Sequence, residues 1–450
     1  MKKTTLFIAI VSTVISLDAQ VSPAISSWMQ NTTNLMGKHY LQGSSTVISD
    51  NVLANVQSVN YSTTNVYVAT NGIPAYTTGP FKDGNPSLAT AQNAIFKLPL
   101  NPTAKTGTKS PTTGGNIGIF INGVALFDYR DGVMWNTTSN NVCGGPGNPM
   151  CPGGPSFTSS WNRDAVPAEK RGFDCSKAHP AMGNYHHHQN PSAFNLDKLI
   201  ASNICDSFPS DGLYVIDSST HSPLIGFAYD GFPIYGSYGY KNIDGTGGIV
   251  RMKSSYNLST ATTRTNGPAV NSTYFNGYFR EDYIYTATSS ATPDYLDEHN
   301  GRFCITPEYP NGIYCYFATV DENWNSVYPY VVGPTFYGVV SGTKVASITE
   351  TVTAYTPSTT GINNPSLEDL KVSVYPNPGT EYLAVQLGQI VNNNIKLILI
   401  DLTGKKLIET TLVQGSTIAY FDTRTLYDGV YLIQIGDAKN TLTKRVVIQH

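Results

Sequence analysis

Short apolar runs separated by turn residues are the feature that most constrains this fold. Asn-Gly at 122–123 and Asp-Gly at 230–231 lie inside apolar runs that span 117–127 and 223–236. Such a pair between two apolar runs favours a tight antiparallel hairpin, because these residues accept positive φ angles. The 29 tyrosines belong to a residue type that is common in strands, and the 40 glycines and 27 prolines supply turns. These patterns predict a mainly β protein.

The length and local composition indicate more than one domain. A chain of 450 residues is too long for a single typical domain. Residues 341–370 are rich in Thr, Ser, Asn and Pro, which predicts a linker. We expect residues 20–340 to form a large, irregular, disulfide-braced β-rich domain. Regularly spaced short strands in 371–450 predict a small C-terminal β-sandwich.

The N-terminus has the pattern of a cleaved export signal. Lys2 and Lys3 precede a short apolar run, and small residues follow it, so residues 1–19 are predicted to be a signal peptide. This run is too short to span a bilayer permanently, and no later run is long enough, so we expect no transmembrane helix in the mature chain. The net charge of −3 and the 13% of charged residues offer no basic footprint for nucleic acid.

Six cysteines in an exported chain are expected to form disulfides rather than free thiols. Six cysteines allow 15 pairings, so the sequence alone leaves the connectivity open. Proximity along the chain favours three bridges: Cys143–Cys151, Cys175–Cys205 and Cys304–Cys315. The alternative is that Cys175 or Cys315 is a metal ligand, which an oxidising compartment disfavours.

A histidine-rich stretch at 183–189 carries most of the recognisable chemistry. If it is extended, alternate side chains face opposite ways, so His186 and His188 share one face. Tyr185 and His187 then lie on the other face. Two imidazoles on one strand can bind a transition metal from the same side. The alternative is a hydrogen-bonded histidine cluster that holds no metal.

A metal at this strand needs a third ligand. The candidates are His179, His299 or a carboxylate from Asp230, Asp297 or Glu298. Asp230 also has a simpler role in forming its turn. Candidate outer-shell or acid–base residues are Tyr185 and three residues of a polar segment: Asp297, Glu298 and Arg302. That segment is equally consistent with a solvated loop. Because imidazole suits both metals, the predicted cofactor is copper or zinc, with metal-dependent hydrolysis or copper redox chemistry as open possibilities.

The C-terminal region resembles the sorting domain of the type IX secretion system of Bacteroidota. The matching blocks occur in order at 374–378, 399–405, 426–431 and 444–448, and include Tyr-Pro-Asn-Pro and Leu-Tyr-Asp-Gly. The resemblance implies interaction with the type IX secretion machinery, export across the outer membrane, and then release or attachment to the cell surface. It implies no catalytic role for this domain.

The large domain resembles the YHYH family. The matching blocks are residues 69–74, 121–124, 183–188, 226–236, 296–303 and 306–310. The naming motif Tyr-His-Tyr-His is Tyr-His-His-His here, and the departure at His187 lies outside the His186–His188 pair. The resemblance implies a domain type rather than a settled activity.

Three functional hypotheses follow from these observations. The first is an exported metal-binding protein. The second is a non-catalytic cell-surface adhesion or glycan-binding protein, because aromatic platforms suit the faces of sugar rings. The third is a surface scaffold whose histidines form a hydrogen-bonded core. Tyrosines that only fill a β core would weaken the second hypothesis.

Overall fold

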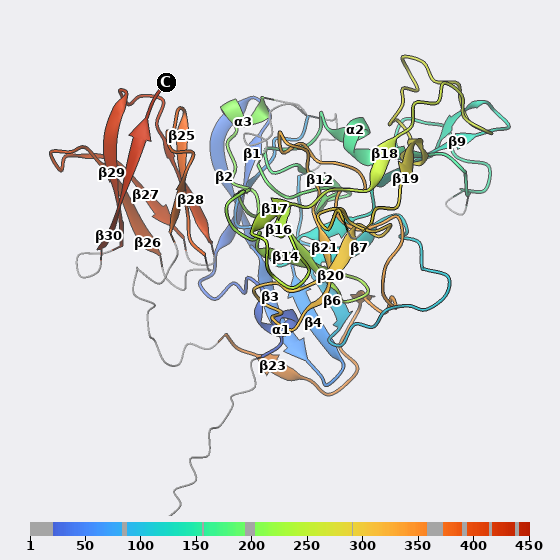
Figure 1. Cartoon of the computed structure of the whole chain (residues 1–450), viewed down its shortest axis with the longest axis horizontal. Helices are drawn as coiled ribbons and strands as arrows, with labels where there is room; N and C mark the ends of the chain where they lie inside the picture. The colour runs from blue at the N-terminus through green and yellow to red at the C-terminus, as the bar shows by residue number, and fades with distance from the viewer. Residues whose placement is uncertain are drawn as a thin grey trace, which may run out of the picture.

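A computed structural model describes residues 21–82, 88–154, 157–193, 203–289, 291–357, 372–388, 394–413, 416–436 and 441–450. The predicted signal peptide, residues 1–19, lies outside these ranges. Strands dominate the described chain (Figure 1), which confirms the prediction of a mainly β protein. The helical elements are short: α1 (Pro23–Ser26), α2 (Ala165–Glu169), α3 (Ile204–Ser207) and the 3₁₀ helix η4 (Arg280–Asp282).

Within the described residues, the largest sheet has the strand order β12-β13-β8-β7-β14-β15-β21-β20 and is called the central sheet here. Its strands are β12 (Ala178–Ala181), β13 (Asn184–His187), β8 (Ala125–Phe127), β7 (Asn116–Phe120), β14 (Leu224–Ala228), β15 (Pro233–Tyr235), β21 (Ile313–Phe317) and β20 (Gly301–Cys304). Both predicted tight hairpins belong to it, with Gly123 and Gly231 at positive φ angles of 82° and 86°. The histidine stretch therefore lies at one edge of the sheet.

The central sheet is buried on both faces. Along β21, Tyr314 and Tyr316 belong to one hydrophobic cluster, whereas Cys315 and Phe317 belong to another. This alternation is the period of two that a strand imposes on its side chains. The first cluster contains seven buried tyrosines: Tyr129, Tyr214, Tyr238, Tyr314, Tyr316, Tyr328 and Tyr330. These tyrosines fill the core, which is the interpretation that weakens a sugar-binding platform.

The second cluster joins the central sheet to a second, antiparallel sheet of order β22-β6-β4-β3-β23. Its strands are β3 (Val56–Tyr61), β4 (Asn65–Thr70), β6 (Ala94–Pro99), β22 (Thr343–Val345) and β23 (Thr353–Tyr355). The strands β22 and β23 lie inside the predicted linker, 341–370. The polar composition of 341–370 gave no signal for these two edge strands. The strands of the large domain therefore extend to Tyr355.

Smaller sheets complete the large domain. Their strands are β1 (Met36–Leu41), β2 (Ser44–Leu53), β5 (Thr77–Thr78), β9 (Arg130–Asn136), β10 (Asn141–Cys143), β11 (Asn162–Asp164), β16 (Tyr238–Tyr240), β17 (Ile249–Arg251), β18 (Tyr256–Leu258) and β19 (Tyr283–Tyr285). The sheet β10-β9-β11 leads directly into α2, because Asp164 ends β11 and caps the N-terminus of that helix.

The C-terminal strands form two further sheets of order β24-β25-β28 and β27-β26-β29-β30 (Figure 1). Their strands are β24 (Ser373–Tyr375), β25 (Tyr382–Gln386), β26 (Ile395–Ile400), β27 (Lys406–Leu412), β28 (Ile418–Asp422), β29 (Gly429–Gly436) and β30 (Thr441–Ile448). Leu383 and Phe421 of one sheet share a core with Leu397 and Ile433 of the other. This packing is that of a small β-sandwich.

Two of the three predicted disulfides are present, Cys143–Cys151 and Cys175–Cys205. The third prediction was wrong, since Cys304 and Cys315 are free, buried thiols. In the β20–β21 register Cys304 faces Ile313, and Cys315 faces Arg302. The two cysteines are therefore diagonal neighbours, for which Cα atoms lie about 7–8 Å apart, whereas a disulfide needs about 4.4–6.8 Å.

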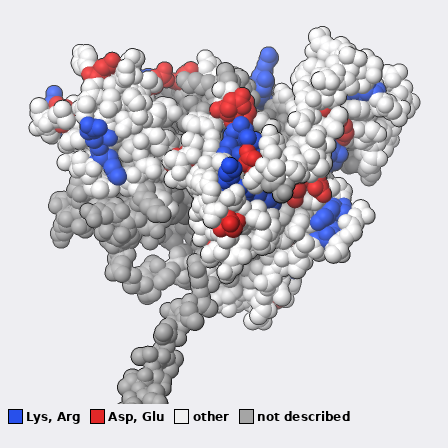
Figure 2. Space-filling model, viewed as in Figure 1, with Lys and Arg blue, Asp and Glu red and all other residues white. Residues whose placement is uncertain are grey.

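The surface carries few charges. Figure 2 shows acidic and basic side chains intermixed on a mostly uncharged face, without a continuous basic area. None of the helices in the described ranges is long and apolar enough to cross a membrane.

Candidate metal centre

The hairpin of β12 and β13 presents the histidines, and its register sets which of them meet. His179 on β12 is directly opposite His186 on β13. The turn between the strands contains Met182 and Gly183 at positive φ angles of 51° and 81°. A Cβ on Gly183 would lie 2.1 Å from the Thr90 hydroxyl oxygen, so glycine is required there. The tight turn thus fixes His179 beside His186.

Three imidazoles converge at this edge of the central sheet. One nitrogen each from His179, His186 and His188 lies within 4.8 Å of the other two, and all three side chains are buried. The His186 and His188 Nε2 atoms are 3.1 Å apart. No other group of three or more His, Cys, Asp or Glu residues in the described part of the chain has this proximity. The predicted same-face pair therefore gains His179 as its neighbour.

Glu169, which the sequence interpretation missed, lies against two histidines of the cluster. Its Oε2 atom lies 3.2 Å from His179 Nε2 and 3.3 Å from His188 Nε2. Glu169 ends α2, a helix whose N-terminus is capped by the Asp164 side chain accepting from the Val166 amide. No local pattern links Glu169 to the histidines, because it lies on a different element and before the Cys175 loop. Only an acidic residue close upstream of His179 was visible as a signal.

The second ring nitrogens are tied to the backbone. His186 Nδ1 donates to the Asn184 carbonyl at 2.8 Å, and His188 Nδ1 donates to the Asp128 carbonyl at 2.6 Å. A carbonyl only accepts, so in each neutral ring the proton is on Nδ1 and Nε2 carries a lone pair. This is the arrangement by which proteins orient metal-ligating histidines.

The centre consequently gathers acceptors. The Nε2 lone pairs of His186 and His188 face each other. The buried Glu169 Oε2, which makes no hydrogen bond, lies 3.3 Å from the His188 Nε2 atom. Acceptors at these distances repel unless a proton or a cation lies between them. Three imidazoles and a carboxylate are the donor set of zinc and copper sites.

Burial favours the neutral form of the His186 imidazole. Burial, followed by the neighbouring His188 and His179, holds the pKa of His186 well below its usual value of 6.5. The neutral ring is the form of histidine that binds metal ions.

Two aromatic rings pack against the histidines. Phe127 stacks on His186 with ring centroids 3.8 Å apart, and Phe173 meets His179 edge-on at 5.0 Å. Phe173 is fully buried, whereas Phe127 is partly exposed. The rings restrict imidazole rotation and lower the local dielectric, so charges at the centre interact more strongly than in water.

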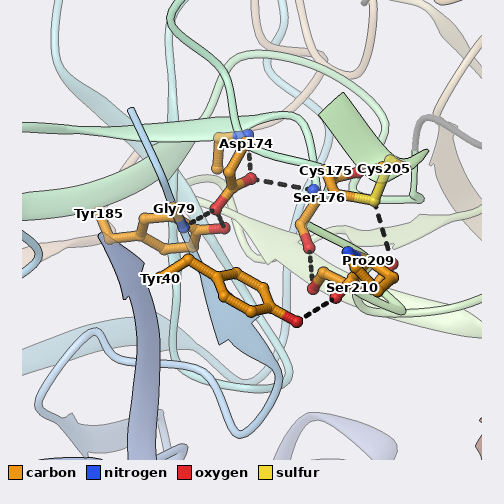
Figure 3. The surroundings of a disulfide bond; sticks show 10 residues. Tyr40, Gly79, Asp174, Cys175, Ser176, Tyr185, Cys205, Pro209 and Ser210 are labelled. Carbon is orange, nitrogen blue, oxygen red and sulfur yellow. Dashed lines mark hydrogen bonds between the residues drawn. A yellow bond between two sulfur atoms is a disulfide. The ribbon is translucent and has the colours of Figure 1, made fainter. Parts of the chain in front are cut away.

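A hydrogen-bond network joins the hairpin to the Cys175–Cys205 bridge (Figure 3). The Asp174 carboxylate accepts from the Gly79 and Ser176 amides and from the Tyr185 hydroxyl, each at 2.8–2.9 Å. Because Asp174 precedes Cys175, it links the disulfide loop to the strand that carries His186. The predicted bridge therefore braces the approach to the histidines.

The opposite face of β13 is structural. His187 accepts from the Tyr76 hydroxyl at Nε2, 3.0 Å away, and donates from Nδ1 to the Lys177 carbonyl. Burial lowers the pKa of His187 to about 3, so the ring is neutral. Tyr185, an acid–base candidate from the sequence, donates to Asp174 and is directed away from the centre.

Two predicted third ligands, His299 and Asp230, do not join the cluster. The Asp230 carboxylate accepts from the Tyr316 hydroxyl at 2.6 Å and the Gly338 amide at 2.8 Å. The Nδ1 atom of His299 hydrogen-bonds to the Thr335 hydroxyl at 2.6 Å. Both side chains hold distant segments of the chain together, and sequence spacing alone could not distinguish them from His179.

The polar segment at 297–302 is also structural. Asp297 accepts from the His299 and Gly301 amides, at 2.9 and 3.1 Å, and from the Tyr314 hydroxyl. Arg302 donates to backbone carbonyls, including that of Lys241 at 3.0 Å. Glu298 is 53% exposed and lies 3.6 Å from His299. None of these three residues belongs to the cluster of His179, His186 and His188.

Comparison with protein families agrees with the two-part structure. A model of the YHYH protein family matches residues 95–329, just over half of the chain. A model of the secretion system C-terminal sorting domain matches residues 373–449. No curated protein matches the chain. The matched region contains all four residues of the centre, and the chain belongs to the YHYH protein family, with a C-terminal sorting domain that directs type IX export.

Proposed function

We propose that this protein is an exported metal-binding protein whose YHYH domain holds copper or zinc. The ligands are His179, His186, His188 and Glu169. The observation that supports the proposal is the convergence of lone pairs described above, with His186 and His188 Nε2 atoms 3.1 Å apart and an unpartnered Glu169 oxygen beside them. A cation turns this repulsion into attraction.

The donor set supports a divalent ion of copper or zinc. Imidazole suits both metals, and the carboxylate oxygen is a hard ligand that favours Zn²⁺ or Cu²⁺ over Cu⁺. Soft thiolate ligands are absent from the centre within the described residues. Cys175 is bonded to Cys205, and the Cys315 thiol donates to the Ile313 carbonyl.

The leader and the C-terminal sorting domain indicate a route of export. The sorting domain directs type IX export, and we propose that the leader at 1–19 first carries the chain across the inner membrane of a member of the Bacteroidota. The mature protein then acts in the medium or attached to the cell surface. The adhesion hypothesis gains no support, because the buried tyrosines named above form a core.

Metal content tests the proposal directly. The chain without its leader is produced in medium supplemented with copper or zinc, desalted, and measured by elemental analysis. We expect about one ion per chain, and less than a tenth of this in a His186→Ala/His188→Ala double variant.

His187→Gln is the matched control, because His187 lies on the same strand but faces Tyr76. It should retain the ion. Equal metal content in the double variant would move the site elsewhere, and a metal-free wild-type protein under replete conditions would refute the proposal.

A further inference from the structure

We infer that Glu169 is an exchangeable ligand and that a small anion from solvent takes its place on the metal. The inference rests on the proposed function and deepens it, because it names the class of molecule that the centre accepts. A metal centre with an exchangeable ligand is open and can act on a bound molecule, whereas a structural site is closed.

The four side chains differ in their access to solvent. The His179 and His188 side chains are 8% and 3% exposed, and His186 is 1% exposed. The Glu169 side chain is 24% exposed, although its Oε2 atom is buried against the histidines. The carboxylate thus spans the boundary between the centre and solvent, and a molecule entering past it displaces Glu169.

The ligands also differ in how firmly the fold holds them. His179 and His186 lie in the paired strands β12 and β13, and His186 and His188 are further fixed through Nδ1. Glu169 ends a helix of five residues, and a rotation of its flexible side chain would carry the carboxylate outward.

Charge balance determines the class of the incoming ligand. Three neutral imidazoles leave a divalent ion with its full double charge, and Glu169 compensates half of it. Replacing Glu169 by a neutral molecule would leave a buried dication poorly compensated, which is costly in a low-dielectric site. A monovalent anion restores the balance. The Phe127 and Phe173 rings next to His186 and His179 favour a small one, such as a short carboxylate or an inorganic anion.

Azide is a suitable probe, because it is a small anion that gives a charge-transfer band when it binds Cu²⁺. The full mature chain is loaded with Cu²⁺, and azide is titrated into wild type, Glu169→Ala and Glu169→Gln while absorption is recorded. We expect saturable binding in wild type and an azide Kd at least about 10-fold lower in both variants, because an intramolecular competitor has been removed. Glu298→Ala, which removes an exposed carboxylate elsewhere, should match wild type.

The outcomes separate the two claims. A protein that binds no Cu²⁺ would refute the proposed function and this inference together. If the Cu²⁺-loaded wild type and both variants show no change in absorption when azide is added, the centre is closed. This result would overturn the inference but not the proposed function. Equal azide affinity in wild type and the Glu169 variants would also overturn it, because the anion would then not compete with Glu169.

Discussion

The histidine hairpin and the turn at 297–302 look alike in sequence but use their polar groups in opposite ways. In the turn, the Asp297 carboxylate accepts hydrogen bonds from the His299 and Gly301 amides, so a side chain fixes the backbone conformation. In the hairpin, backbone carbonyls bind the Nδ1 atoms of His186 and His188, so the backbone organises side chains. A histidine cluster is a candidate metal centre only when its hydrogen bonds to the backbone leave nitrogen lone pairs free to bind a metal ion.

Metal addition should give the largest contrast between the two regions. At metal concentrations about 1,000 times Kd, binding to the native state should stabilise the chain by about 4 kcal/mol. This corresponds to a rise in Tm of roughly 10 °C in thermal denaturation, reversed by a chelator. The rise should vanish in His186→Ala/His188→Ala. His299→Ala should retain it, and its loss there would place the ligand in the turn instead.

Loss of the Cys175–Cys205 bridge should affect both stability and metal binding. The bridge closes a separation of 30 residues, so the Cys175→Ser/Cys205→Ser variant should lose about 3–4 kcal/mol in urea denaturation. Metal affinity should fall about 10-fold, because the loop leads into His179.

The bridge Cys143–Cys151, with a separation of 8, provides the control. Its removal should cost about 2–3 kcal/mol without changing the metal Kd. Unchanged metal affinity in the first variant would show that the hairpin is rigid without its brace.

Asp297→Ala should separate stability from metal binding. It leaves the His299 and Gly301 amides and the Tyr314 hydroxyl without their acceptor, so the free energy of unfolding should fall by about 3 kcal/mol. Metal content per folded chain should not change. Glu298→Ala, at the adjacent exposed position, should lie within about 0.5 kcal/mol of wild type. A drop in metal content would contradict the structural role of Asp297.

His221 lies outside the histidine cluster and shows the effect of burial on the pKa of a histidine that has no other histidine or metal ligand beside it among the described residues. Burial lowers its pKa to about 4, and its ring lies 5.2 Å from Tyr235 and 4.9 Å from Tyr240. The unfolded state binds the proton first, so the neutral ring stabilises the fold above pH 6.5, and this contribution is lost as pH falls towards 4.

At pH 5 the loss should be about 1–2 kcal/mol relative to pH 8. His221→Gln should reduce this part of the acid dependence in urea denaturation at several pH values. An unchanged pH profile would show that other groups account for the acid sensitivity.

The sequence alone determined the local parts of this picture. Alternation along a strand placed His186 and His188 on one face and His187 on the other, as the hydrogen bonds of β13 confirm. Turn chemistry predicted the hairpins at Gly123 and Gly231, and block order identified the sorting domain. These features depend on neighbours within a few residues, so the chain carries their signal directly.

The tertiary structure decided which distant residues meet. It selected His179 rather than His299 or Asp230, brought Glu169 from α2 to the histidines, and set Cys304 diagonal to Cys315. These outcomes depend on strand order, register and the placement of a short helix. Many sequences share the same local patterns with different long-range pairing, so only the packed fold shows where the unsatisfied atoms converge.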